Sequence, residues 1–241
     1  MRICASGGFA PVTIYRSYLV EYFLRMKFPV LPPERASNRT MYPPTQRLAV
    51  YAIWGVWVGL VFFSIYPTMN WLTGLRTGHN ELFFQAELGL PFVPEFIWVY
   101  LSMYALFLLP PFFLNPLELK RLASELIIAT IVSGAIFLLL PARLGFERAL
   151  PEAPVYKAIF QGVFSADQPF NLVPSLHIVY STAISFAVIA QAGRYTRRFM
   201  VIWLLMIMAS TVLVHQHHLL DVVTGFMLAV LMRALLEKRY A

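Results

Sequence analysis

Long runs of apolar residues, separated by short polar segments, make up most of the chain from residue 48 onward. A helix needs about 20 apolar residues to cross the hydrocarbon core of a bilayer. Runs of this kind are Leu48–Tyr66, Phe96–Leu114, Leu122–Leu140, Leu172–Ala190, Phe199–Val214 and Leu219–Leu236. The pattern predicts an all-α integral membrane protein, a bundle of six transmembrane helices.

The amino-acid composition agrees with this fold class. Of the 241 residues, 59% are hydrophobic and only 13% are charged, which is about half the charged share of a soluble domain. These values exclude a disordered chain, and they argue against a soluble enzyme because a body of this size cannot bury so much apolar surface. The single cysteine, Cys4, excludes an internal disulfide framework and a cysteine-based zinc site.

The basic residues are divided unevenly between the two sides of the predicted bundle. Of the 19 Lys and Arg residues, 15 lie in segments that a six-span protein places on one side. The other side holds only Arg76, Arg143, Arg148 and Lys157. The positive-inside rule therefore puts both termini in the cytoplasm. We expect a plasma-membrane protein whose loops at 67–95, 141–171 and 215–218 face outward, and we attribute the net charge of +7 to orientation and not to nucleic-acid binding.

Residues 1–46 are predicted to form a basic cytoplasmic arm and linker, distinct from the six-span domain at 47–241. The first apolar stretches are short and broken by Arg16, Glu21 and Arg25, which argues against a cleavable signal peptide. Repeated prolines make the part from 28 to 46 an expected irregular linker. Two interpretations of the arm stay open: an amphipathic segment on anionic lipid, or a poorly ordered tail.

Ionisable side chains at the outward ends of the predicted spans are candidate functional residues, because charge at membrane depth is costly. His177 lies near the start of the fourth span, and His217 and Asp221 lie at the turn between the fifth and sixth. Arg143 and Arg148 follow the third span. The orientation argument therefore predicts that these residues share one membrane face.

The spacing of these residues favours phosphoryl transfer. His217 and Asp221 are four residues apart, so a helix would place the carboxylate where it can fix the tautomer of the imidazole. Pro174 can start a helix whose free N–H groups, at and after Ser175, would bind an anion. An outward arginine would add a guanidinium fork for phosphate oxygens. One histidine would attack phosphorus and the other would protonate the leaving oxygen.

Simpler interpretations of the same residues stay open. Either histidine could be an interfacial polar residue or a partner of a neighbouring helix, and the arginines could be ordinary loop charges. A metal site built from His215, His217, His218 and Asp221 is a further alternative, although neighbours in sequence rarely all point at one ion. We predict that the protein uses no metal and no cofactor.

One of these segments resembles the second signature of the type 2 phosphatidic acid phosphatase superfamily. That signature is usually Pro-Ser-Gly-His, and here it reads Pro174-Ser-Leu-His177. The form with Leu176, preceded by Phe170-Asn171, is similar to the branch that contains inositol phosphorylceramide synthases. The sequence therefore resembles this branch of the superfamily.

The third signature of the superfamily is Ser-Arg, five residues, His, three residues, Asp. Ser210, His217 and Asp221 fit this spacing, with Thr211 in place of the arginine. The first signature, Lys, six residues, Arg-Pro, is not present in the sequence. Arg143 and Arg148 lie in its neighbourhood without matching it.

The resemblance covers about residues 96–236 and implies a six-helix membrane enzyme that acts through a phosphohistidine intermediate. It implies that His217 is the nucleophile, that Asp221 orients it, and that His177 is the general acid. We expect Arg143 to be the main phosphate clamp and Arg148 the second choice, because Arg143 directly follows the third span. Ser175 and Ser210 are the other predicted phosphate-binding residues.

The leading functional hypothesis is a phosphatase that hydrolyses a phosphomonoester or pyrophosphate lipid at the outer membrane face. The alternative is a phosphotransferase, similar to inositol phosphorylceramide synthases, that moves a phospho-headgroup between lipids. A third possibility is a non-catalytic lipid-binding or transport protein that keeps the histidines as polar contacts. In each case the expected partners are membrane lipids that carry phosphate.

Overall fold

Helices form almost all the regular structure, and they confirm the predicted all-α fold class. The structure is a computed structural model that describes residues 42–240, so the greater part of the predicted N-terminal arm, at 1–41, lies outside the described residues. Between the helices, the loops that follow α2 (Pro44–Gly74) and α6 (Pro116–Leu139) meet in an isolated β-bridge that pairs Asn80 with Ala142. The site must therefore be positioned by helix packing and by loops tied to helix ends.

Four long helices arise from four of the predicted spans. They are α2 (Pro44–Gly74), α6 (Pro116–Leu139), α9 (Arg194–Leu213) and α10 (Leu219–Tyr240). Each is long and apolar enough to cross a membrane. The first of them starts earlier than predicted, inside the expected irregular linker, because Pro44 at a first helical position needs no partner for a backbone N–H.

The segment predicted as the second span is broken into short helices instead of one continuous helix. Pro110 and Pro111 have no backbone N–H and cannot extend the helix that precedes them. Earlier in the segment, a short helix ends at Leu101. The hydroxyl of the next residue, Ser102, donates to the backbone oxygen of Val99 at 2.6 Å. The pieces are η4 (Pro94–Phe96), α3 (Ile97–Leu101), α4 (Met103–Leu106) and α5 (Pro110–Phe113).

The segment predicted as the fourth span forms a helix of only 16 residues, α8 (Leu176–Gln191). Its start is set by Ser175, whose hydroxyl accepts the N–H of Ile178, and its length of about 24 Å is less than a bilayer core. The prediction of six continuous transmembrane helices is therefore wrong. The described residues contain four helices that meet the length and composition of a span.

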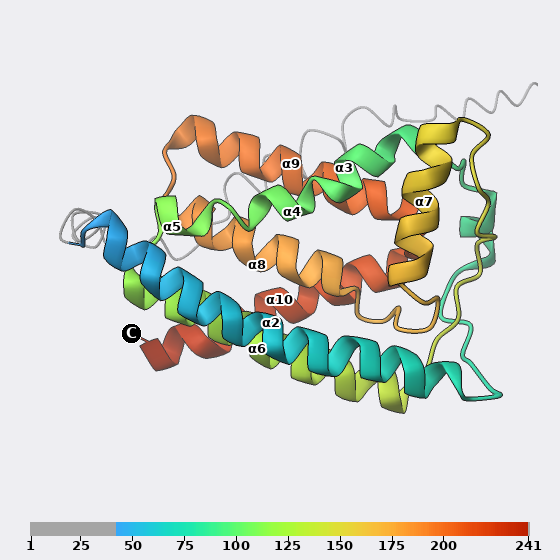
Figure 1. Ribbon diagram of the computed structural model, residues 1–241, viewed down its shortest axis with the longest axis horizontal. Helices are drawn as coiled ribbons and strands as arrows, with labels where there is room; N and C mark the ends of the chain where they lie inside the picture. The colour runs from blue at the N-terminus through green and yellow to red at the C-terminus, as the bar shows by residue number, and fades with distance from the viewer. Residues whose placement is uncertain (1–41, 241) are drawn as a thin grey trace, which may run out of the picture.

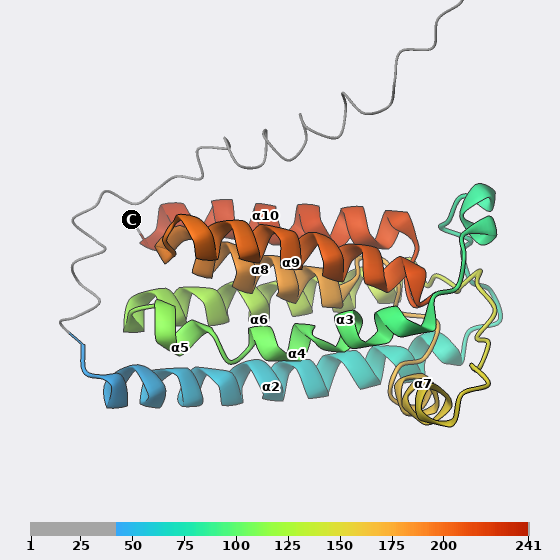
Figure 2. The ribbon, with the colours of Figure 1, turned by 90° about the horizontal axis from the view of Figure 1, so that it is seen from above.

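The loops predicted to face outward contain two helices that the hydrophobic pattern did not predict. They are η3 (Gln85–Gly89) and α7 (Pro154–Ala166). Both views show α7 lying across one end of the long helices, and in Figure 2 it is seen end-on. The helix α7 has only 13 residues, which is too short for a hydrophobic pattern of membrane length, and the segment was therefore not predicted as a helix.

The short helix α8 lies at the centre of the bundle. It packs against α4, α5, α6, α9 and α10, and Figure 2 shows it between the layers that these helices form. Residues 178–189 of α8 are all buried, in agreement with a sequence that is apolar on every side. At the edge of this core, α2 approaches α6 so closely that a Cβ at Gly134 would lie 2.4 Å from Ile65.

The two ends of the bundle differ in what they carry. In Figure 1 the start of α2, the α5–α6 and α8–α9 connections and the C-terminus lie at the left end. The loops after α2 and α6, helix α7 and the α9–α10 turn lie at the right end. The loops predicted to share the outward face are therefore together at one end of the molecule.

Candidate active site

The turn between α9 and α10 is wound tightly around one backbone oxygen. The backbone N–H groups of Gln216 and His217 both donate to Thr211, each at 3.0 Å, and His215 adopts a left-handed conformation with φ 54°. Asp221 lies in the first turn of α10, where its carboxylate accepts the backbone N–H of His218 at 2.8 Å. An acidic group at a helix N-terminus is favourable, so this turn is stabilised by the residue that also faces His217.

The start of α8 is seated directly on the first turns of α10. The backbone N–H of Ser175 donates to the backbone oxygen of Asp221 at 3.1 Å. One turn further along α10, a Cβ at Gly225 would lie only 2.6 Å from the backbone oxygen of Ser175. Backbone atoms cannot give way as a flexible side chain can, so only glycine permits this approach. The approach brings His177, in the first turn of α8, to the α9–α10 turn.

Four side chains form a hydrogen-bonded row at this junction. His217 Nδ1 lies 3.2 Å from Asp221 Oδ2, and His217 Nε2 lies 3.4 Å from His177 Nδ1. The other ring nitrogen of His177, Nε2, is 2.7 Å from the hydroxyl of Tyr100 in α3. The predicted residues His177, His217 and Asp221 are thus brought together, and Asp221 and His217 are almost completely buried.

For neutral histidines, the row has one consistent arrangement of protons that ends at the carboxylate. Asp221 can only accept, so His217 Nδ1 carries a proton and His217 Nε2 holds a lone pair. His177 Nδ1 then donates to that lone pair, and its Nε2 accepts the proton of the Tyr100 hydroxyl. The contact between the histidines, at 3.4 Å, is the longest of the row. It is therefore the contact that a bound group can most readily separate.

The two serines predicted to bind phosphate are engaged inside the protein. The Ser175 hydroxyl caps α8, and its backbone N–H is taken by Asp221. The Ser210 hydroxyl donates to the backbone oxygen of Ile207 at 2.7 Å within α9. Both residues are buried. Their contacts are those of structural residues, and a role in phosphate binding stays a prediction for both.

The two predicted arginine clamps lie in different environments. The guanidinium of Arg143 forms an ion pair with Glu81, and more than half of its side chain is exposed. Arg148 donates to the backbone oxygens of Phe164 and Asp167, at 3.3 and 2.7 Å, and covers the ring of Phe164. Its Nε atom is buried and has no hydrogen-bond partner among the described residues. Arg148 therefore has a buried N–H donor that is free to bind a phosphate oxygen. The guanidinium of Arg143 is instead exposed and paired with Glu81.

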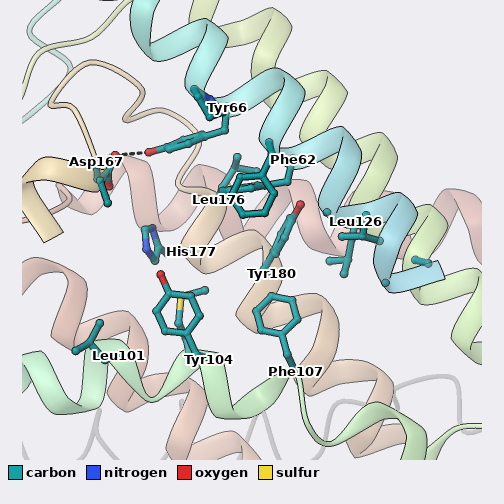
Figure 3. A pocket seen from close by; sticks show the side chains of 18 of the residues that line it. Phe62, Tyr66, Leu101, Tyr104, Phe107, Leu126, Asp167, Leu176, His177 and Tyr180 are labelled. Carbon is teal, nitrogen blue, oxygen red and sulfur yellow. Dashed lines mark hydrogen bonds between the residues drawn. The ribbon is translucent and has the colours of Figure 1, made fainter. Parts of the chain in front are cut away.

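Asp167 is an acidic residue of the site that no sequence pattern predicts. Its carboxylate accepts the hydroxyl of Tyr66 from α2, as the dashed line in Figure 3 shows, and it lies within electrostatic reach of His217 and Arg148. Burial raises the pKa of Asp167, while the Tyr66 hydroxyl, His217 and Arg148 act in the opposite direction. Burial likewise lowers the pKa of the Arg148 guanidinium, and Asp167 opposes that shift. The charges of Asp167 and Arg148 therefore stabilise each other, and Asp167 also lies within electrostatic reach of His217.

The remaining histidines of the turn point to separate partners. His215 Nε2 is 3.1 Å from the backbone oxygen of Leu90, and His218 Nδ1 is 3.1 Å from the carboxylate of Glu87. Since His217 pairs with Asp221, the three histidines of the alternative metal site each contact a different partner and do not point at one common position. Across residues 42–240, no group of three or more His, Cys, Asp or Glu side chains is arranged to hold a metal ion.

A cavity of about 730 Å³ adjoins His177 and Asp167. Its walls come from α2, α3, α4, α6, α7 and α8, and they are mainly aliphatic and aromatic. On α2 alone the lining runs from Tyr51 to Pro67, which corresponds to about 24 Å along the helix. Figure 3 shows the ring of His177 between Asp167 and the apolar side chains that line the cavity. Labelled there are Phe62, Leu101, Phe107, Leu126, Leu176 and Tyr180.

The segment that holds this site matches a known family. Residues 119–238, from the first turns of α6 to the end of α10, match the PAP2 superfamily. Through this segment, the chain belongs to the PAP2 superfamily. PAP2 proteins are generally phosphatases or phosphotransferases. The match confirms the superfamily expected from the two sequence signatures, whereas the inositol phosphorylceramide synthase-like branch stays a prediction.

No curated protein and no solved structure matches the chain. The PAP2 match together with four candidate spans makes this an integral membrane protein of phosphatase or phosphotransferase type. Tyr66 and Tyr100, which contact Asp167 and His177, lie in α2 and α3, outside the matched residues. These contacts are therefore contributed by the part of the chain that the PAP2 match does not cover.

Proposed function

We propose that this PAP2 protein is a lipid phosphatase that cleaves a phosphomonoester or pyrophosphate lipid through a phosphohistidine intermediate. The observation that carries the proposal is the position of the Asp221–His217–His177 row beside a long apolar cavity. A nucleophile, an orienting carboxylate and an acid suit phosphoryl transfer, and the adjoining apolar space suits a hydrocarbon chain.

In the first step, the lone pair of His217 Nε2 attacks phosphorus. A bond forms between nitrogen and phosphorus, and the bond from phosphorus to the leaving oxygen breaks. His177, which carries a proton on both ring nitrogens when the substrate is bound, gives its Nδ1 proton to that oxygen and is left neutral, so a neutral alcohol leaves from a phosphomonoester, or a phosphate from a pyrophosphate. Asp221 accepts the Nδ1–H of His217 throughout and stabilises the positive charge that the ring gains.

In the second step, a water molecule attacks the phosphohistidine. His177 takes a proton from the water at Nδ1, the water oxygen bonds to phosphorus, and the bond to His217 breaks. Phosphate is released and both rings return to their starting states. We assign Tyr100 a positioning role, because its hydroxyl at Nε2 keeps the exchangeable proton of His177 on the nitrogen that faces His217.

The two histidines should differ in how far an activated substrate rescues their loss. His217→Ala removes the nucleophile, so no turnover is expected on a lipid phosphate or on an aryl phosphate. His177→Ala should lose about 10²- to 10⁴-fold on the lipid phosphate. It should lose much less on the aryl phosphate, whose leaving group needs no proton. The measurement is the release of phosphate by purified full-length protein, with His215→Gln as the matched histidine control.

Selective rescue of His217→Ala would reverse these assignments. Equal residual activity in both variants would contradict the phosphohistidine mechanism. If His217→Ala binds the lipid phosphate and no substrate is turned over by the wild type, the protein is a non-catalytic lipid-binding protein.

We further propose that the apolar cavity holds the hydrocarbon chain of the substrate. Gly59 lines the cavity from α2, and a Cβ built at this position meets nothing within 4 Å. Gly59→Phe should therefore fill the space without disturbing the fold. We expect about a tenfold loss in kcat/KM for a long-chain lipid phosphate, comparable to losing the burial of roughly two methylene groups. Turnover of an aryl phosphate should be unchanged.

The control for this experiment is Ala52→Phe, which adds the same ring to an exposed position of the same helix outside the cavity. It should leave both substrates unaffected. Equal activity of Gly59→Phe and Ala52→Phe on the long-chain substrate would show that the chain binds elsewhere.

Arg148 is the better-supported phosphate clamp, although Arg143 is the first choice from sequence. Its buried, unpartnered Nε and its position beside Asp167 support this assignment. Arg148→Lys keeps the charge but loses the planar fork, so kcat/KM should fall about 10- to 100-fold, the equivalent of one charge-assisted hydrogen bond. Arg143→Lys, the matched control, should stay near the wild-type rate. The opposite ranking of the two variants in a phosphate-release assay would restore Arg143 as the clamp.

A second candidate function is transfer of the phospho-headgroup to another lipid alcohol. The buried carboxylate of Asp167, next to His177 in the cavity lining, supports it because a carboxylate can accept the hydroxyl proton of an acceptor alcohol. Transfer differs from hydrolysis only in the second step, where an alcohol replaces water. Purified protein given candidate phospholipids should release free phosphate if it is a phosphatase, and should form a new phospholipid if it is a transferase.

We propose that the site faces outward from the plasma membrane, with both termini in the cytoplasm. The concentration of Lys and Arg on one side supports this orientation. The exposed positions Glu152 and Arg194 lie in segments at opposite ends of the bundle. In a Cys4→Ser background, a membrane-impermeant thiol reagent on intact cells should label Glu152→Cys and leave Arg194→Cys unlabelled. Labelling of Arg194→Cys alone would mean that the orientation is reversed.

A further inference from the structure

The imidazole of His218 is a buried titratable group that the proposed reaction does not use. It follows His217 in the chain, and only 1% of it is exposed. Its Nδ1 lies 3.1 Å from Oε2 of Glu87, in η3, and its Nε2 accepts the backbone N–H of Gly145 at 3.0 Å. Three segments that are far apart in sequence therefore meet at this one ring.

The hydrogen bonds determine the protonation state of the ring. A backbone N–H can only donate, so Nε2 of His218 must hold a lone pair toward Gly145. The proton is then on Nδ1, where it is donated to Glu87. That carboxylate also accepts the backbone N–H groups of Leu219 and Phe84, at 2.9 and 3.2 Å. His218 is accordingly neutral, and Glu87 is satisfied as an anion by three donors.

Ring stacking reinforces the same junction. The imidazole of His218 lies between the rings of Phe83 and Phe146, with centroid separations of 4.6 and 4.4 Å. His215 stacks on the far face of Phe146 at 4.0 Å. A Cβ at Gly145 would lie 2.6 Å from the Phe83 ring, so the backbone here rests directly on an aromatic face. The loops before α3 and after α6 are thus both held against the α9–α10 turn.

We propose that Glu87 and His218 are positioning residues that hold the segment 143–148 against the α9–α10 turn only while His218 is neutral. The proposal rests on the proposed function in one respect, the role of Arg148 as the phosphate clamp. Arg148 is three residues from Gly145 and two residues from Phe146, whose ring is stacked on His218. Loss of the Gly145 contact would free the backbone that aims its guanidinium.

Protonation breaks this arrangement for a geometric reason. A second proton on His218 must go to Nε2, where it would point at the N–H of Gly145. Two donors would then face each other, and the loop would have to leave the ring before the charge could be hydrated. Proton uptake and release of the loop are therefore one event.

The charges around His218 determine the pH range of the change. Burial is the largest influence and lowers the pKa of His218 from 6.5, while Asp221 and Glu87 raise it and His217 lowers it. The ring of His215, on the far side of Phe146, is coupled to it as a further titratable group. Since the neutral form is favoured in the folded state, the contact is fully stabilising above pH 6.5 and weakens progressively as the pH falls below it.

The test is hydrogen–deuterium exchange of the peptide 141–150 in the full chain, embedded in lipid nanodiscs without substrate. Exchange is compared at about pH 7.5 and about pH 5.5, on either side of the ordinary histidine pKa. The reference is His218→Gln, because its side-chain oxygen can accept the Gly145 N–H but does not titrate. Measuring both proteins at each pH removes the intrinsic pH dependence of exchange.

We expect wild type and His218→Gln to exchange alike at the higher pH. At the lower pH the wild-type peptide should exchange about tenfold faster than the variant, the equivalent of one lost hydrogen bond. His218→Ala should exchange rapidly at both values. His215→Gln, the matched control, stacks on the same phenylalanine without bonding the loop and should behave like wild type.

Equal exchange of wild type and His218→Gln at both pH values would overturn the proposal. So would a loss of the pH effect in His215→Gln, which would assign the effect to the other histidine. The exchange experiment contains no substrate, so its result does not depend on whether the protein hydrolyses lipid phosphates. A failure of the His218 proposal is therefore distinguishable from a failure of the proposed phosphatase function.

Discussion

The approach of α8 to α10 is the contact on which the rest of the site depends. The start of α8 rests on the first turns of α10, where Gly225 leaves room for the backbone of Ser175 and Asp221 accepts its N–H. Any side chain at Gly225 would push the two helices apart, because the opposing atom belongs to the backbone. The two histidines come from segments 40 residues apart, and this contact places their nearest ring nitrogens 3.4 Å apart. Helix packing, and not a local motif, therefore creates the histidine pair.

Burial makes the hydrogen bonds around this contact directional. With Asp221 and His217 almost inaccessible to water, each donor must meet an acceptor, and the proton positions follow from the partners. The same reasoning applies on the far side of the turn, where Glu87, His218 and Gly145 form a second row. The α9–α10 turn thus holds two adjacent histidines in one tautomer each. His217 faces His177, and His218 faces the loop residues Glu87 and Gly145.

The broken segment between η4 and α5 has a direct consequence for the site. A continuous helix there would follow one straight path, whereas short helices allow the chain to bend along the bundle. In this segment Tyr100 contacts His177, and α3 and α4 form part of the cavity wall together with α2. Tyr66 reaches Asp167 from α2. Residues outside the PAP2 match therefore shape both the apolar space and the polar contacts at its end.

The sequence by itself determined the fold class, the four long helices of the described residues, and the choice of His177 and His217 as candidate residues. Apolar runs of membrane length identify α2, α6, α9 and α10, because helix length and composition are local properties. The spacing of His217 and Asp221 likewise predicts their contact from a shared helix face, and the contact forms although His217 lies in the turn before α10 and only Asp221 is helical. The predicted count of six spans failed where prolines and a capping serine interrupt apolar sequence, at α3–α5 and α8, because hydropathy averages over such breaks.

Only the tertiary structure decided which other side chains belong to the site. Tyr66, Tyr100, Glu87 and Asp167 carry no spacing pattern, and each meets its partner across a separation of more than 70 residues. The ranking of the two arginines also depends on surroundings: one pairs with Glu81 at the surface, and the other is partly buried beside Asp167 with a donor unused. Long-range packing sets these distances and the burial of each group. The hydrophobic pattern and the spacing of residues along the sequence predict neither the distances nor the burial.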